Sequence, residues 1–307
     1  MWGGNDRNDA IKAIQASYDL GVNAIDTAAV YGQGESEEIV GDAVKDIPRD
    51  KVYILTKFVM RWDLEHPKGD FAFKSKDNAG VDIDVYRYAG KESIILECEN
   101  SLKRLGTDYI DLYQIHWPDT TTPIEESMEA VAQLIKDGKV RYAGVSNYSA
   151  DQMEEAVKYV NVVSNQVPYS MIKRDIEKTL VPWCIENNKS ILAYSPMERG
   201  LLTGKIKPGH VFAEGDHRTN LYYFRDENII KTNAFLNSIR PIAESKGISL
   251  GQLVLLWTIE QPGITIALAG ARNAEQAIQN AKAADVDLSK EEVDQITQSL
   301  GALQLVK

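Results

Sequence analysis

Four titratable side chains end or follow short apolar segments of the sequence. Asp26, Lys57 and His116 occupy such segment ends, and Tyr31 comes shortly after Asp26. Each alone has a structural explanation: Asp26 can cap a turn, Lys57 can be a solvated rim charge and His116 a hydrogen-bonded core residue. Together, a carboxylate, a phenol, an ammonium and an imidazole at neighbouring segment ends favour a site for general acid–base chemistry.

The segments that carry these residues read as buried parallel strands. Each is short, apolar and bounded by Gly, Pro, Ser or Asn, which is typical of strands covered on both faces. The stretches between them show helical spacing, as in Met128, Val131 and Leu134 or Ile135, which indicates contact with a sheet. The predicted strands are 22–26, 52–56, 109–116, 141–145, 162–165, 191–194 and 265–268.

This alternation predicts an α/β fold, a (β/α)8 TIM barrel in which the carboxyl ends of the strands meet at one mouth. We count seven strands, and a predicted helix at 8–20 precedes the first of them. A closed barrel needs one more strand, which by position belongs upstream of Met1. We therefore expect a barrel without its N-terminal hairpin and first strand. No G-x-G-x-x-G turn supports a doubly wound sheet instead. Residues 1–307 are predicted to form a single domain.

Two stretches, 61–90 and 205–228, are long for barrel loops and rich in aromatic residues. Loops of this length are functional or disordered. The number of aromatic residues favours ordered loops that pack over something, either a substrate or the barrel rim.

Composition excludes several classes of protein. The 307 residues are 44% apolar and carry a net charge of -11, which argues against a nucleic-acid surface. No apolar run approaches the roughly 18 residues of a membrane helix, and no signal peptide precedes the first helix. Cys98 and Cys184 give no disulfide framework, and the four histidines have no metal-site spacing. We predict a cytoplasmic protein with no metal, membrane or nucleic-acid partner; its oligomeric state stays open.

An ordered set of motifs, running from Met1 to about Asn280, resembles the aldo-keto reductase family of the bacterial NADPH-dependent type. As a set these motifs are specific, whereas each alone is weak. In chain order they are DTAAVYG at 26–32, GESE at 34–37, LTK at 55–57, LKRLGTDYIDLYQIH at 102–116, GKVR at 138–141, GVSN at 144–147, YSP at 194–196, GLLTGK at 200–205, and GARNAEQ at 270–276 with Asn280.

The resemblance implies an oxidoreductase that reduces an aldehyde or ketone to an alcohol by hydride transfer from NADPH. Tyr31 would be the proton donor. Because a free tyrosine has a pKa near 10, the Lys57 ammonium is expected to lower that pKa, and Asp26 to hold Lys57 charged and in place. His116 would orient the carbonyl oxygen of the substrate.

The resemblance also implies the contacts to NADPH/NADP+. It assigns Ser146, Asn147 and Gln166 to the nicotinamide amide and Tyr194 to the nicotinamide ring. The residues that it assigns to the pyrophosphate and adenosine end are Ser195, Leu201, Lys205, Gly270, Arg272, Gln276 and Asn280. Pairing of Arg272 with a 2′-phosphate would favour NADPH over NADH.

The chain departs from the family pattern in two places. Ala269 stands where relatives usually have proline, which is a small change. In relatives a hairpin and a first strand precede the segment that resembles residues 1–4, so we expect either a start set at an internal methionine or a truncated form.

Two other functions stay open. One is an NADPH-binding regulatory subunit that resembles the β subunits of potassium channels and has little turnover. The other is a different barrel enzyme such as a glycosidase, which needs two carboxyl groups at a sugar site; here only Asp26 lies at a strand end, and Lys57 explains it. For the small-molecule carbonyl substrate, the mouth position selects Trp62 and Trp117 as pocket residues, without deciding the substrate or the reaction direction.

Overall fold

The computed structural model describes residues 6–213 and 215–307. By their contacts these residues form two compact units. The N-terminal unit comprises Ser17–Val167 and Lys178–Leu192. The C-terminal unit comprises the described residues up to Ala16, together with Pro168–Glu177 and Ala193–Lys307. The prediction of a single domain stays a prediction.

The N-terminal unit is organised around parallel strands that pair in sequence order. Gln114 lies opposite Lys57, and Gln166 lies opposite Ser146, so polar residues of neighbouring strands come into register. Every residue of β6 is buried, including the polar residues Asp111 and Gln114. These strands are β1 (Ala24–Asp26), β2 (Tyr53–Phe58), β6 (Ile110–Ile115), β7 (Val140–Ser146) and β8 (Val162–Pro168).

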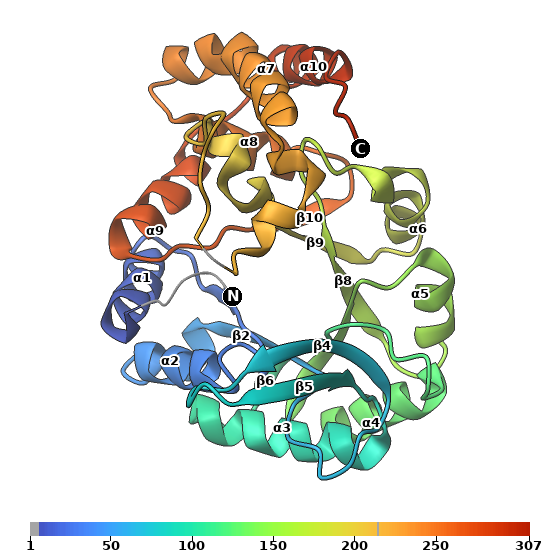
Figure 1. The fold of residues 1–307 in the computed structure, drawn as a ribbon. Coiled ribbons are helices and arrows are strands. Elements are labelled where there is room, and N and C mark those ends of the chain that lie inside the picture. Colours follow the sequence, from blue (N-terminus) through green and yellow to red (C-terminus); the bar gives the residue numbers. More distant parts are fainter. Residues whose placement is uncertain (1–5, 214) are drawn as a thin grey trace. The chain divides into compact units, whose positions relative to one another are not determined.

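Helices cover the outer side of these strands, and α2, α3 and α4 lie side by side along them (Figure 1). The predicted stripe of Met128, Val131 and Leu134 is buried on α4, as expected. The helices of this unit are α2 (Glu35–Val44), α3 (Lys91–Leu105), α4 (Ile124–Lys136), α5 (Ala150–Ala156), α6 (Leu180–Glu186) and the short η1 (Arg49–Lys51).

The long stretch 61–90 contains a small antiparallel sheet with strand order β3-β5-β4, in which β4 and β5 lie side by side (Figure 1). Its strands are β3 (Met60–Arg61), β4 (Asp70–Lys76) and β5 (Asp82–Arg87). Its inner side forms an apolar cluster with the loop after β1, in which Ala28, Val30, Met60 and Val85 are buried. The aromatic residues of this stretch thus belong to an ordered element that packs on the chain next to Tyr31.

The C-terminal unit is mainly helical. Helix α8 is buried almost all round, and it contacts β10, α7 and α9; α7 also packs beside α10 (Figure 1). Its helices are α1 (Arg7–Asp19), η2 (Asp175–Lys178), η3 (Glu198–Thr203), η4 (His217–Asn220), η5 (Tyr222–Phe224), α7 (Asp226–Ser245), α8 (Leu250–Ile259), α9 (Ala274–Ala281), η6 (Lys282–Asp285) and α10 (Lys290–Gly301).

The second long stretch, 205–228, packs through its aromatic residues. Ile206, Tyr223 and Phe224 are buried in a cluster with Leu201, and Phe212 packs against it. Aromatic residues of this stretch thus pack on one another and on Leu201.

With β9 (Ser190–Tyr194) and β10 (Ile264–Leu268), the main sheet has the order β1-β2-β6-β7-β8-β9-β10. Strands in sequence order, alternating with helices, confirm the predicted α/β barrel class and the seven predicted strands. The eighth strand, expected upstream of Met1, lies outside the described residues.

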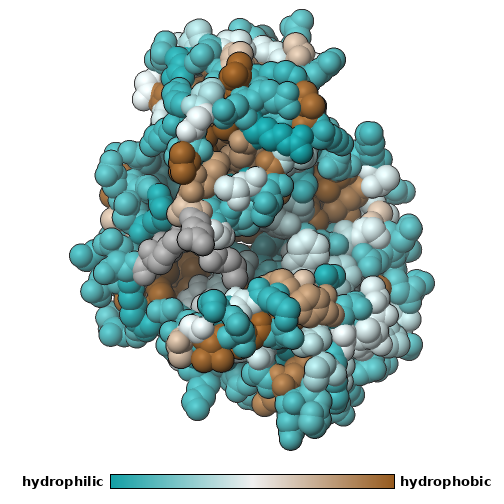
Figure 2. All heavy atoms as spheres, in the orientation of Figure 1, coloured by the Kyte–Doolittle hydropathy of each residue, from teal (hydrophilic) through white to brown (hydrophobic). Residues whose placement is uncertain are grey.

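The surface is mostly hydrophilic on the face that Figure 2 shows, with hydrophobic residues scattered in small groups. Within the described residues, no helix has both the length and the apolar character needed to cross a membrane. Cys98 and Cys184 are buried free thiols.

Candidate active site

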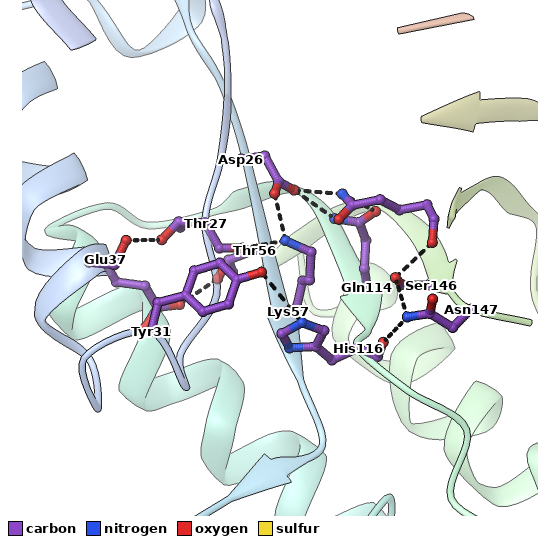
Figure 3. Close-up of polar contacts among 12 residues, drawn as sticks. Asp26, Thr27, Tyr31, Glu37, Thr56, Lys57, Gln114, His116, Ser146 and Asn147 are labelled. Atoms are coloured by element: carbon purple, nitrogen blue, oxygen red, sulfur yellow. Dashed lines mark hydrogen bonds and ion pairs between the residues drawn. The ribbon is translucent and has the colours of Figure 1, made fainter. Parts of the chain in front are cut away.

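The structure brings the four predicted titratable residues together inside the N-terminal unit (Figure 3). Asp26 ends β1, Lys57 lies in β2, His116 follows β6, and Tyr31 lies in the turn before α2. Lys57 Nζ is 2.6 Å from Asp26 Oδ2, and the Tyr31 hydroxyl oxygen is 3.5 Å from His116 Nε2. Lys57 Nζ also lies 5.3 Å from the centre of the Tyr31 ring. This cluster can move a proton and stabilise a negative charge.

Lys57 is a buried ammonium with fixed partners. Its side chain has no exposed surface, and Nζ donates to Asp26 and to the carbonyl oxygen of Thr27 at 2.8 Å. Burial lowers the pKa of Lys57, but attraction by Asp26 raises it, and the net direction is upward. Lys57 is therefore positively charged at neutral pH.

The pKa of Tyr31 is raised above its ordinary value of 10.0. Burial of the hydroxyl is the largest cause; the Lys57 ammonium lowers the pKa by less, and Asp26 raises it again. Although 36% of Tyr31 is exposed, its hydroxyl points inward towards His116 (Figure 3). The Lys57 ammonium does lower this pKa, as predicted, but burial outweighs the ammonium and the net shift is upward. Tyr31 is thus protonated at neutral pH, as a proton donor must be.

His116 is a neutral imidazole. Burial and the nearby Lys57 charge hold the pKa of His116 well below its ordinary value of 6.5. Its Nδ1 atom is buried without a hydrogen-bond partner among the described residues, so Nε2, beside the Tyr31 hydroxyl, is the ring atom that engages the site.

A tight turn positions Tyr31. The Tyr31 amide donates to the carbonyl of Ala28, and the Ser36 amide donates to the carbonyl of Tyr31. Gly34 has a φ of 102° and leaves no room for a side chain, since a Cβ there would lie 2.5 Å from Arg104 Cδ. The glycines of the 26–37 motifs thus allow the backbone conformation of this turn.

A layer of amide and hydroxyl side chains extends the cluster along β6, β7 and β8. Gln166 Nε2 donates to Asp26 Oδ1 at 2.8 Å, and Gln114 Nε2 donates to the same oxygen at 3.3 Å. Ser146 Oγ donates to the carbonyl of Gln166, and Asn147 Nδ2 donates to the carbonyl of His116. Such a layer of hydrogen-bond donors and acceptors suits a carboxamide ligand, which has both an N–H donor and a carbonyl acceptor.

Sequence reasoning missed Gln114. The signal was present: Gln114 interrupts an apolar run two residues before His116, and residues two apart on a strand face the same side. Its side chain leaves little space on β7, because a Cβ on Gly144 would lie 2.9 Å from Gln114 Cγ.

The predicted adenosine-end residues meet in the C-terminal unit, on the segment between β10 and α9 and on α9 itself. The Arg272 amide donates to Gln276 Oε1 at 3.0 Å, and Asn280 Nδ2 donates to the carbonyl of Gly270 at 3.2 Å. Arg272 is exposed, and the space beside Gly270 is open. An accessible guanidinium beside the amino end of a helix fits the phosphate of a nucleotide.

The predicted pyrophosphate residues follow β9 in the same unit. Tyr194 ends β9, and Ser195 has a φ of 56°, in the left-handed region. Lys205 is exposed just beyond η3. Leu201 is fully buried in the aromatic cluster, so a ligand contact there would use its backbone.

The two predicted pocket tryptophans differ in environment. Trp62 packs against the apolar cluster of Ala28, Val30, Met60 and Val85. Trp117, directly after His116, is 39% exposed, and the Arg87 guanidinium lies 5.8 Å from its ring centre. Of the two, Trp117 offers the larger free surface to a ligand.

The sequence profile described as "Aldo/keto reductase family" matches residues 1–300. Aldo-keto reductase YhdN of Bacillus subtilis (strain 168) is 39% identical over 278 residues, which are 90% of this chain and 78% of that protein. The NADH-specific methylglyoxal reductase of Escherichia coli (strain K12) is 35% identical over 307 residues, 99% of this chain and 91% of that protein.

A probable voltage-gated potassium channel subunit beta of Oryza sativa subsp. japonica is 31% identical, over 95% of this chain and 87% of that protein. Among solved structures, the glycerol dehydrogenase AKR11B4 from Gluconobacter oxydans is similar with a TM-score of 0.87 and 36% identity, over 98% of this chain and 88% of that one. An aldo-keto reductase from Klebsiella pneumoniae in complex with NADPH has a TM-score of 0.71 and 31% identity, over 95% and 84% of the two chains.

Proposed function

Because the chain belongs to the aldo-keto reductase family, we propose that it reduces an aldehyde or ketone to an alcohol, with NADPH as the reductant and Tyr31 as the proton donor. One observation carries the proposal: a protonated tyrosine and a neutral histidine face each other beside a buried lysine–aspartate pair.

The chain's own residues account for the proton and for the orientation of the substrate. The Tyr31 hydroxyl donates its proton to the carbonyl oxygen, and the Lys57 ammonium stabilises the phenolate that remains. Neutral His116 donates a hydrogen bond from Nε2 to the same oxygen and so orients it. Asp26 keeps Lys57 charged and in place.

NADPH, when bound, supplies the hydride that reduces the carbonyl carbon. Ser146, Asn147 and Gln166 would hold its carboxamide, and Arg272 its 2′-phosphate. The Klebsiella pneumoniae neighbour was solved with NADPH, whereas the Escherichia coli relative is named as NADH-specific. We favour NADPH because Arg272 offers a guanidinium, which suits a phosphate dianion.

Replacing Tyr31 with phenylalanine tests the assignment. Tyr31→Phe keeps the ring and removes the proton, so aldehyde-dependent oxidation of NADPH, followed by absorbance, should fall below a few per cent of the wild-type rate. NADPH binding, followed by fluorescence titration, should be unchanged. Turnover above that level would remove Tyr31 from the role of proton donor.

The rice relative favours a second candidate, a regulatory subunit that binds NADPH with little turnover. Tight NADPH binding without turnover of a broad panel of aldehydes and ketones by the wild-type chain would select this function. The complete set of Asp26, Tyr31, Lys57 and His116 supports the reductase.

A further inference from the structure

The backbone bends sharply where β2 ends, two residues after Lys57. Val59 has a φ of 90° and no exposed surface. A β-branched residue rarely adopts this left-handed region, because its side chain clashes with the backbone. Such a conformation persists only where the surroundings hold it in place.

Three hydrogen bonds hold the two residues of this bend. The Val59 amide donates to Glu97 Oε2 at 3.0 Å. The Val59 carbonyl accepts from the Tyr88 amide at 3.0 Å, and the Phe58 carbonyl accepts from the His116 amide at 3.1 Å. The bend therefore joins β2, which carries Lys57, to the first residue after β6, which is His116.

Of these partners, only Glu97 contributes a side chain. It lies on α3 and is 5% exposed, and its Oε1 atom accepts from Ser93 Oγ at 3.2 Å. The Ser93 hydroxyl in turn accepts from the Arg61 guanidinium. Burial raises the pKa of Glu97 to about 8 even though Arg61 lowers it. Burying a carboxyl group costs free energy unless it is hydrogen-bonded, and the hydrogen bonds from Val59 and Ser93 offset this cost for Glu97.

We propose that Glu97 is a positioning residue for the active site: its carboxyl group holds the strained Val59 peptide, and the bend so fixed keeps Lys57 and His116 in place. This inference rests on the proposed reductase function. Glu97 touches none of the reacting atoms, so it acts only through the backbone.

The strain at Val59 supplies a matched genetic test. Glycine adopts positive φ freely, so a chain with Val59→Gly needs no side chain to hold the bend. Loss of the Glu97 acceptor should therefore lower kcat strongly when residue 59 is valine and only weakly when it is glycine. Glu97→Gln keeps an acceptor and should behave like the wild type.

We would compare kcat and the KM for NADPH in the wild type, Glu97→Gln, Glu97→Met, Val59→Gly and the double variant Val59→Gly/Glu97→Met. Glu92→Met, an exposed site on the same helix, is the control. We expect Glu97→Met to lower kcat by about ten- to hundredfold, since displacements of about 1 Å have such effects, with the KM for NADPH within about twofold. In the Val59→Gly background the same change should lower kcat by less than about threefold.

A readout without turnover separates this inference from the proposed function. The ring signals of His116 in an NMR spectrum are identified by their loss in His116→Asn. Relative to the wild type, they should shift in Glu97→Met and stay unchanged in Glu92→Met. The shift caused by adding Glu97→Met to the Val59→Gly variant should be smaller. If Tyr31→Phe keeps its turnover, the proposed function fails, while this spectral test still decides the positioning role.

Three outcomes would overturn the proposal. One is an unchanged kcat and an unchanged His116 signal in Glu97→Met. Another is an equal loss of kcat on adding Glu97→Met to the wild type and to the Val59→Gly variant. The third is failure of Glu97→Met to fold in both backgrounds, which would make Glu97 a general stabiliser of the fold. Folding only in the Val59→Gly background would support the proposal.

Discussion

The two oxygens of the Asp26 carboxylate bind different partners. One oxygen pairs with Lys57, and the other accepts from Gln166 and Gln114. Because both oxygens are occupied, the carboxylate cannot rotate away from the ammonium without losing hydrogen bonds on its other side. Asp26 therefore keeps Lys57 charged, and Gln166 and Gln114 keep the Asp26 carboxylate in position.

Replacing Asp26 with asparagine should move the pH dependence of the reaction. Asp26 raises the pKa values of both Lys57 and Tyr31, so its removal lowers both. In Asp26→Asn, the alkaline limb of kcat/KM for aldehyde reduction should shift to lower pH, and the rate at pH 7 should fall by about tenfold or more. Rates measured from pH 6 to 10 check this.

The exposed variant Asp50→Asn serves as the control and should leave the profile in place. An alkaline limb that stays where it is in Asp26→Asn would mean that neither Lys57 nor Tyr31 sets it.

Among the elements, the β4–β5 hairpin is tied to the loop that carries Trp117. Thr120 donates its amide to Asp70 Oδ2 at 2.8 Å and its hydroxyl to Asp70 Oδ1 at 2.9 Å. These bonds lower the pKa of Asp70. The start of β4 thus fixes the chain just beyond His116 and Trp117.

Asp70→Ala should therefore weaken substrate binding more than chemistry. Loss of these bonds frees the loop, so the KM for the carbonyl substrate should rise by about two- to tenfold, while kcat and NADPH affinity stay within about twofold. Steady-state kinetics with Asp84→Ala as the control check this, because Asp84 forms an exposed pair with Lys74 on the same hairpin. A larger effect on kcat than on KM would contradict this role.

Helices and parallel strands were predictable from the sequence because their apolar periodicity is local. The antiparallel sheet was not predicted, because β4 and β5 are half-exposed and carry charged residues, whereas the predicted strands were recognised as short apolar segments typical of buried strands. Helix α3 shows a second limit. The helical spacing of Ile95, Cys98, Leu102 and Leu105 predicts a buried stripe on this helix. Cys98 and Leu105 are buried, whereas Ile95 and Leu102 are only partly buried and Glu97 is inside. Its partners Arg61 and Val59 are distant in sequence, so no local pattern reveals them.

For the whole molecule, two buried groups make stability depend on pH in opposite directions. The folded-state pKa of Glu97 is raised to about 8 from 4.5, so its contribution is complete below pH 4.5 and is lost as the pH rises through 8. The folded-state pKa of His116 is depressed below 6.5, so its contribution is present above pH 6.5 and is lost as the pH falls.

Glu97→Gln should remove the alkaline part of this dependence, since an amide does not titrate. The free energy of unfolding of the wild type, from urea titrations, should fall between pH 6 and 9 relative to that of Glu97→Gln, by up to about 3 kcal/mol at about 1.4 kcal/mol per pH unit. A constant difference between the two proteins across this range would show that Glu97 does not titrate near 8.

At this scale the class of fold and the order of seven strands could be predicted from the sequence, because only a few topologies are compatible with alternating strands and helices. It also sufficed to bring Asp26, Tyr31, Lys57 and His116 together, because parallel strands end on one side. The direction of the Tyr31 pKa was not predictable, since burial depends on how loops pack rather than on residue type.

The apolar cluster beneath the small antiparallel sheet has a consequence for how this protein can diversify. Ala28 and Val30, which precede the proposed proton donor, share that cluster with Met60 and Val85 from the sheet. Substitutions that change the inner side of the sheet therefore also change the packing of the segment that carries Tyr31. New specificities should arise first at solvent-facing positions such as Trp117, and changes on the inner side of the sheet should need a compensating change at residue 28 or 30.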